Sequence, residues 1–250
     1  MARRERTMRD GRVLIYRHPW LVRASHWVNA LCLLILLFSG LQILNAHPHF
    51  YWGQASHFAA PAFNVGPIPG WLTLPSYADL GAGRRWHFFF AWIFVINGLV
   101  WAATALARRT LWPSRAQLRG FGTAVLDHLK LRFAHGEDAG GYNVLQKLSY
   151  VAVLFGLLPL MVLTGLAMSP GTDAVLPWLT QIAGRQTMRT VHFLSASGLV
   201  LFLIVHLAMV VAAGPLNEMR SILTGWFSIG RPEPAPPEPV EEEAAHDLQP

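Results

Sequence analysis

Four hydrophobic runs, separated by polar, Pro-rich or Gly-rich segments, set the pattern of this chain of 250 residues. They cover residues 21–44, 86–106, 148–168 and 191–213. Each is long enough for a membrane-spanning helix, which needs about 20 mostly apolar residues. The pattern predicts an all-α integral membrane fold, a four-transmembrane-helix bundle over residues 21–227. A basic lead-in (1–20) precedes the bundle, and a Pro- and Glu-rich tail (228–250) has the composition of a disordered segment.

The charge balance agrees with a membrane protein and predicts its orientation. Only 14% of the residues are charged and 53% are hydrophobic, whereas a soluble domain carries roughly 25% charged residues. Seven arginines precede or open the first run and seven basic residues lie between the second and third runs, but residues 45–83 contain none. The positive-inside rule therefore predicts cytoplasmic termini in a multi-pass protein of the bacterial inner membrane. Because the net charge of +6 comes from segments beside the spans, no nucleic-acid partner is expected.

Cysteine is excluded as the basis of any redox function. The single cysteine, Cys32, lies inside the first run. A disulfide framework, a four-cysteine iron–sulfur cluster and covalently attached c-type haem need more cysteines or a C-x-x-C-H motif. Any electron carrier must therefore be held by other side chains.

Four of the eleven histidines fall within or at the ends of the hydrophobic runs: His26, His87, His192 and His206. Ionisable residues rarely face lipid, so each is a candidate functional group. Each one alone also fits a structural role. His87 and His192 lie close to arginines and could extend to the membrane surface, and His206 could hydrogen-bond a neighbouring helix.

Spacing and depth arrange these histidines into two facing pairs. His192 and His206 are 14 residues apart, which is about 21 Å along a helix with an angular offset of roughly 40°. They therefore share one helix face at opposite depths. Because successive spans alternate in direction, His26 matches the cytoplasmic depth of His206, and His87 matches the periplasmic depth of His192.

Two facing imidazoles at each depth suit an iron porphyrin with both axial positions filled. Mononuclear zinc or copper is less suitable, since the pairs lie too far apart to share one ion. Gly40 and Gly98 share faces with His26 and His87, and either admit a porphyrin edge or serve helix packing alone. Because a filled coordination shell disfavours oxygen binding, electron transfer is the expected task.

Four stretches resemble the di-haem cytochrome b membrane subunits of the bacterial cytochrome b561/Ni,Fe-hydrogenase family. They read RHPWLVRASHWVNALCLLILLFSGLQI, GRRWHFFFAWIFVINGLVW, YNVLQKLSYVAVLFGLLPLMVLTGLAM and RTVHFLSASGLVLFLIVHLAMV, and with NEMRSILTGW they cover most of residues 17–227. The stretch PGWLTLPSYADLGAGRRWHFFF looks most like the thiosulfate-reductase-type branch. The first periplasmic connection is longer than in the hydrogenase and formate dehydrogenase subunits, so their docking surface is not carried over.

The resemblance implies an electron-transfer subunit of an oxidoreductase complex rather than a complete enzyme. It implies two non-covalent haem b groups, one held by His26 and His206 near the cytoplasm and one held by His87 and His192 near the periplasm. It also implies exchange of electrons with ubiquinone or menaquinone in the lipid membrane and with a periplasmic redox protein, either a molybdenum oxidoreductase or a soluble cytochrome.

Two further sets of polar residues are candidates for binding sites. A quinone site needs an apolar slot with a few polar groups, and propionates suit arginine. The quinone candidates near the cytoplasmic pair are Asn29, Asn217 and Arg220. The propionate candidates near the periplasmic pair are Arg84, Arg85 and Arg189. Arginines at these positions equally suit a role as interface anchors.

Two other functions compete with that of an electron-transfer subunit. A di-haem cytochrome of the same fold could act alone as a superoxide:quinone oxidoreductase, and the isolated chain would then reduce quinone with superoxide. A non-redox anchor or transporter could use the histidines as proton relays, and the purified protein would then lack a haem absorption band.

Overall fold

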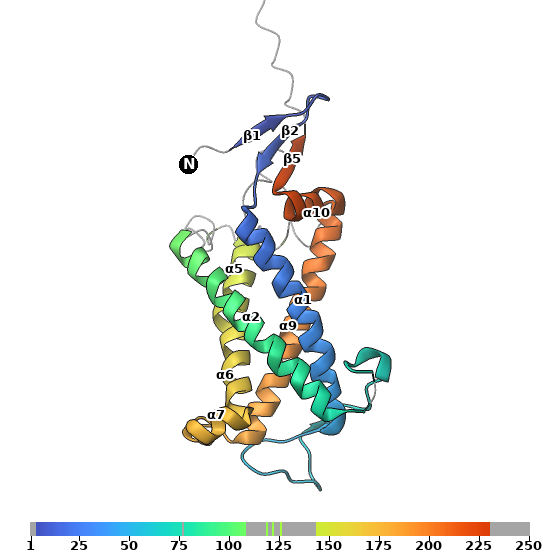
Figure 1. The fold of residues 1–250 in the computed structure, drawn as a ribbon, viewed down its shortest axis with the longest axis vertical. Coiled ribbons are helices and arrows are strands. Elements are labelled where there is room, and N and C mark those ends of the chain that lie inside the picture. The colour runs from blue at the N-terminus through green and yellow to red at the C-terminus, as the bar shows by residue number, and fades with distance from the viewer. Residues whose placement is uncertain are drawn as a thin grey trace, which may run out of the picture.

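The computed structural model describes residues 4–76, 78–108 and 144–230, together with the isolated positions 119, 122 and 126. Residues 231–250 of the predicted tail lie outside this described part. Within it, four helices are long and apolar enough to cross a membrane, and they form an elongated bundle (Figure 1). The predicted four-helix transmembrane fold is therefore confirmed.

The four spans extend slightly past the hydrophobic runs, because the interfacial layers add to a hydrocarbon core of roughly 30 Å. The first, second and fourth spans are α1 (Trp20–Ala46), α2 (Leu80–Arg108) and α9 (Arg185–Ala213). The third runs through α5 (Val144–Ala152), the π-helical turn η3 (Val153–Leu157) and α6 (Leu158–Met168). Pro159, which lacks a backbone N–H, follows the wide η3 turn closely.

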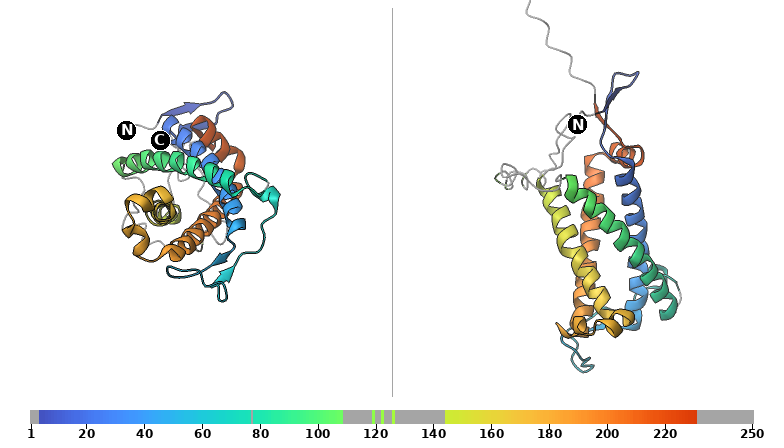
Figure 2. Two further views of the ribbon diagram at one scale, coloured as in Figure 1. Left: turned by 60° about the horizontal axis from the view of Figure 1, so that its bottom comes forward. Right: turned by 60° about the vertical axis from the view of Figure 1, so that its left-hand side comes forward.

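The bundle consists of two antiparallel helix pairs. Helix α1 packs along α2, and α6 packs along α9. Figure 2 shows the two pairs from two further directions. The four histidines lie where α9 of one pair faces α1 and α2 of the other. The site is thus built between the pairs rather than inside either of them.

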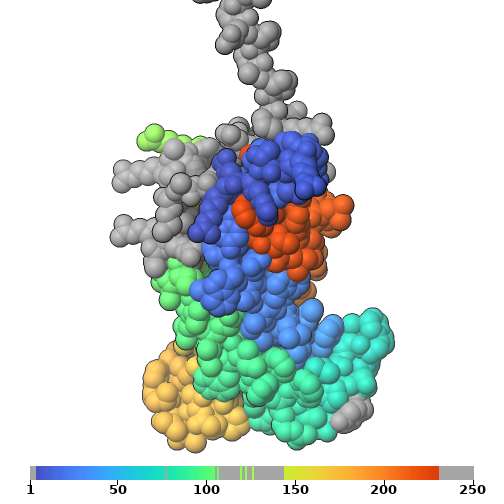
Figure 3. All heavy atoms as spheres, turned by 45° about the horizontal axis from the view of Figure 1, so that its top comes forward, coloured from blue at the N-terminus to red at the C-terminus, as the bar shows by residue number. Residues whose placement is uncertain are grey.

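One end of the bundle carries a small folded unit, here named the cap. Its sheet has the strand order β1–β2–β5 and is antiparallel throughout. The cap consists of β1 (Glu5–Thr7), β2 (Val13–Tyr16), helix α10 (Pro215–Thr224) and β5 (Trp226–Gly230). Leu14, Ile15 and Phe227 are buried in it, and Figure 3 shows the N-terminal hairpin lying against the C-terminal segment.

The cap was not predicted from the sequence. The all-α expectation omits its sheet, and the predicted division at residue 227 falls inside β5. Gly225 makes the close approach of the two ends of the chain feasible. Its φ is +90°, and a Cβ there would lie 2.6 Å from Cε2 of Tyr16. Both the backbone conformation and the lack of space therefore exclude a side chain.

The opposite end, here named the loop end, is closed by the connection after α1. It contains β3 (His49–Phe50), β4 (Phe63–Asn64) and the short helix η1 (Gly70–Leu72), and α7 (Pro170–Val175) and α8 (Trp178–Gln181) lie at the same end (Figure 1). Phe50 and Tyr51 are buried there. Thr190 of α9 donates to the Tyr51 carbonyl at 2.8 Å. The first connection is thus packed onto α9 rather than free.

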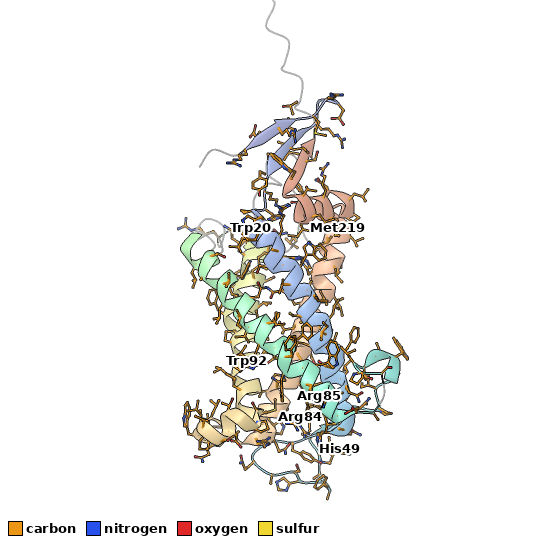
Figure 4. The ribbon with its side chains drawn as sticks, viewed as in Figure 1. Trp20, His49, Arg84, Arg85, Trp92 and Met219 are labelled. Carbon is orange, nitrogen blue, oxygen red and sulfur yellow. The ribbon has the colours of Figure 1, made fainter. Side chains whose placement is uncertain are left out.

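Helix α10 presents an apolar stripe to its surroundings. Leu216, Met219 and Leu223 are 88%, 40% and 57% exposed, and their spacing of three and four residues puts them on one face. Another face holds β5 through Asn217. Because α10 follows the end of a membrane span directly, we expect the stripe to lie in the lipid interface. Figure 4 shows Met219 at the same end of the bundle as Trp20, an aromatic residue type common at that depth.

An environment-sensitive fluorophore tests this expectation. With buried Cys32 replaced by Ala, a label on Met219→Cys in nanodiscs is expected to emit at shorter wavelength and to be quenched by lipids that carry a quencher in the acyl chain. Met8→Cys is the matched control, because Met8 is also 40% exposed but lies in the β1–β2 turn. Equal emission and quenching at both positions would contradict the interfacial placement of α10.

Candidate functional site

The structure brings the four histidines together in the two predicted pairs. The ring centres of His26 on α1 and His206 on α9 are 6.4 Å apart, with 51° between the ring planes. Those of His87 on α2 and His192 on α9 are 6.3 Å apart, at 64°. The first pair lies toward the cap and the second toward the loop end.

These spacings distinguish between a hydrogen bond and a shared metal. A direct N–H···N bond of about 2.9 Å would bring two imidazole centres to roughly 5 Å. Two nitrogens that each lie about 2.0–2.1 Å from one metal ion place the ring centres about 6.3 Å apart, since a ring nitrogen is about 1.1 Å from its centre. Both pairs fit the second arrangement. Among the described residues, no three His, Cys, Asp or Glu side chains come together as a metal site. Each pair is therefore suited to a metal ion whose remaining ligands come from a bound cofactor.

A serine fixes the protonation of His87. Ser39 Oγ lies 2.6 Å from the Ile35 carbonyl, to which it donates its single proton. It can therefore only accept from His87 Nδ1, 3.1 Å away. The proton then sits on Nδ1, and Nε2 keeps the lone pair that a metal needs.

Helix α6 repeats this arrangement for His192. Thr164 Oγ1 donates to the Leu160 carbonyl at 2.7 Å and accepts from His192 Nδ1 at 3.0 Å. The Met161 carbonyl lies 3.1 Å from the same nitrogen and gives it a second acceptor. Ser39 and Thr164 are almost fully buried. The loop-end pair is thus held in one tautomer by two equivalent hydroxyl groups on two different helices.

A glycine follows each hydroxyl residue and makes room for the imidazole. A Cβ at Gly40 would lie 3.4 Å from Cε1 of His87, and one at Gly165 would lie 3.2 Å from Cε1 of His192. Gly40 therefore faces an imidazole ring of α2, and its expected role at a porphyrin edge stays a prediction. Gly98, the other predicted glycine, has no atom of the described residues within 4 Å of a Cβ.

Sequence reasoning missed Ser39, Thr164 and Gly165. A signal was present, since Ser-Gly-Leu at residues 39–41 and Thr-Gly-Leu at residues 164–166 repeat one pattern in the first and third spans. It could not be interpreted without knowing which helices pack together.

The cap-end pair has different neighbours. Phe202 stacks on His206, with 6.0 Å between the ring centres. Nδ1 of His26 is buried and has no hydrogen-bond partner among the residues that the structure describes. Nearby, Asn97 of α2 donates to the Ser25 carbonyl at 2.9 Å and to Oδ1 of Asn29 at 2.8 Å. These bonds fix α2 against α1 beside His26.

All three predicted quinone residues make hydrogen bonds within the protein, and Asn217 and Arg220 bond to each other. Asn29 is bonded to Asn97, as above. Asn217 both donates to the Ser228 carbonyl at 2.9 Å and accepts from the Ser228 N–H at 3.0 Å, and it also accepts from Arg220. Asn217 therefore holds β5 against α10, and its side-chain oxygen is already shared by two donors.

The predicted propionate residues lie at the loop end, where Figure 4 labels two of them. Arg84 and Arg85 are exposed, and the Arg84 guanidinium lies 5.6 Å from the centre of the Phe88 ring. Arg189 donates to the His49 carbonyl and stacks on Phe50 at 5.1 Å, while its Nε is buried without a partner. Two of the three arginines thus stay open to solvent or a ligand, and the third keeps one unpaired donor.

Four membrane spans with an imidazole pair toward each end define a helical membrane protein suited to hold porphyrin iron. The comparisons with known proteins agree. Residues 17–225 match the family described as prokaryotic cytochrome b561. The putative protein-methionine-sulfoxide reductase subunit YedZ1 of Azospira oryzae is 33% identical over 195 residues, which cover 77% of this chain and 88% of that protein. The chain belongs to the prokaryotic cytochrome b561 family, as the resemblance predicted, and that family binds b-type haem.

Proposed function

We propose that this chain is a di-haem b-type cytochrome that carries electrons between the quinone pool and a redox partner on the periplasmic side of a bacterial inner membrane. His26 and His206 hold one haem b, and His87 and His192 hold the other. The observation that carries the proposal is the pair of ring-centre distances, 6.4 and 6.3 Å, because both match two imidazoles on one iron.

The arrangement favours electron transfer over oxygen chemistry. A haem held by two histidines would supply reversible one-electron transfer and would leave no position for oxygen. Helix α9 provides one ligand to each site, and its rigidity fixes the distance between them. Ser39 and Thr164 keep the protons of His87 and His192 on Nδ1, so these ligands are ready for iron without rearrangement.

The relative's name suggests the class of partner. That protein is named as a subunit of a putative protein-methionine-sulfoxide reductase. We infer that this chain passes electrons from ubiquinol or menaquinol to a periplasmic reductase of that kind, which docks at the loop end. The name mentions no molybdenum, so the molybdenum cofactor expected of the partner stays a prediction.

Quinol-driven reduction in nanodiscs tests the proposed function. Under anaerobic conditions, added quinol is expected to reduce the haem absorption bands of the purified chain. The co-purified partner with a methionine sulfoxide substrate is expected to reoxidise them. Haems that quinol cannot reduce would contradict the proposal. Rapid quinone reduction by superoxide with the isolated chain would instead identify a stand-alone superoxide:quinone oxidoreductase.

A further inference from the structure

An arginine precedes three of the four histidines by three residues. The pairs are Arg23–His26, Arg84–His87 and Arg189–His192. Residues three apart lie on one helix face, and each of these histidines is near the start of its span. Each arginine is therefore one turn closer to the membrane surface than its histidine. His206 is near the end of its span. An arginine nearer the membrane surface than His206 would therefore lie at the end of α9 or in α10.

Within the described part of the chain, several buried donors near the cap-end pair have no hydrogen-bond partner. Arg23 Nε and Arg220 Nε are buried without a hydrogen bond, as is the Ser221 hydroxyl, whose residue is 0% exposed. Nδ1 of His26 is also buried without a hydrogen bond. All of these groups can donate a hydrogen bond, and two of them belong to cations. Leaving such groups unpaired is costly, so together they indicate an acceptor with negative charge.

The two segments that carry these donors are in contact. Arg23 Nη1 donates to the Leu223 carbonyl of α10 at 2.7 Å. The backbone N–H groups of Arg17 and His18 donate to the Gly225 carbonyl at 2.8 and 3.3 Å. Glu218, the one acidic residue of α10, is already paired with Arg17 at 3.4 Å. The donors therefore gather where α10 meets the start of α1, without a carboxylate of α10 left to neutralise Arg23 and Arg220.

We propose that Arg23 and Arg220, assisted by Ser221, form an anion site for the carboxylates of the haem held by His26 and His206. This inference rests on the proposed function. The guanidinium fork matches a carboxylate in two-point contact. Arg23 precedes His26 by three residues, as Arg189 precedes His192. The guanidinium Nε of Arg189 is likewise buried and unpaired among the described residues. Arg220, which the sequence placed with quinone, is instead a haem carboxylate ligand.

Redox titration of the full chain in nanodiscs tests the site. Arg23→Gln and Arg220→Gln are each expected to lower the midpoint potential of one haem only, because losing a nearby cation favours the more positive oxidised iron. That haem is the one that disappears in His206→Ala. Its transfer to apomyoglobin is expected to become about tenfold faster, the effect of losing one charge-assisted hydrogen bond. Arg23→Lys is expected to retain most of the potential.

Arg6→Gln is the matched control. Arg6 lies on β1 and is exposed, so the same change of charge is expected to leave both haems as in the wild type. An unchanged second haem shows that each variant is folded. If Arg23→Gln and Arg220→Gln titrate and release haem like the wild type, the inference is wrong although the di-haem proposal stands. If these two variants instead lose a bound anionic phospholipid in native mass spectrometry while both potentials stay unchanged, the site binds a lipid phosphate. That result would also overturn the inference. A wild-type chain that binds no haem would overturn both.

Discussion

Replacing Gly165 by Val is expected to remove one of two haems and to leave the other in place. The Cβ alone would lie 3.2 Å from Cε1 of His192, and the two γ-methyl groups of valine fill the same space. The imidazole cannot retreat, because Nδ1 is held by Thr164 and by the Met161 carbonyl. The ring must turn, and its Nε2 then no longer faces His87. The measurement is haem per protein, together with the redox titration of the haem that remains.

Gly156 provides the control for this substitution. It lies in the same span, is exposed, and has no atom within 4 Å of a Cβ. Gly156→Val makes the same change of side chain in the same span and is therefore expected to keep both haems. Full haem content in Gly165→Val would show that haem binding through His192 does not require the space beside Gly165.

Gly184→Ala is expected to destabilise the loop end more than any other single methyl group added to α9. Gly184 precedes α9 with a φ of +85° and ψ of +147°, a conformation that only glycine adopts readily. A Cβ would also lie 2.4 Å from the backbone carbonyl of Gly53, and backbone cannot move aside cheaply. Backbone strain and overpacking together cost about 3 kcal/mol or more, which corresponds to a fall of roughly 6–12 °C in Tm for a chain of this size.

Gly214, at the other end of the same helix, separates backbone strain from overpacking as the cause of the lost stability. Its φ is +106°, but no atom lies within 4 Å of its Cβ position. Gly214→Ala is expected to show the backbone strain alone, about 1–2 kcal/mol. Thermal melts of both variants, followed by helical circular dichroism, measure the difference. Equal Tm values would mean that a methyl group at residue 184 does not clash with the Gly53 backbone.

The transmembrane helices and the histidine pairs could be predicted because both depend on local pattern and depth. The length of an apolar run identifies a span, and alternation of direction then matches His26 with His206 and His87 with His192. No contact between distant segments had to be known.

The cap depends on contacts that no local pattern reveals. Val13 of β2 pairs with Gly230 of β5, more than two hundred residues away, and strands of three to five residues give little periodicity. Asn217 illustrates the consequence. Its contact with Ser228 of β5 could not be foreseen from the sequence, and its expected role at a quinone site stays a prediction.

The hydroxyl–glycine arrangement explains why the loop-end pair is more constrained than the cap-end pair. Ser39 and Gly40 hold His87, and Thr164 and Gly165 hold His192 in the same way. His26 has no such acceptor at Nδ1. Because a hydrogen bond at Nδ1 raises the basicity of an imidazole ligand, the two haems are expected to differ in potential.

The ratio of haem to protein in matched histidine variants tests the central claim most directly. The pyridine haemochrome assay is expected to give two b-type haems per wild-type chain, one in His206→Ala and one in His192→Ala. His47→Ala, just beyond α1, is expected to keep two. A ratio that stays at two in His206→Ala, or a wild-type chain without haem, would contradict the assignment of the two histidine pairs as axial ligands.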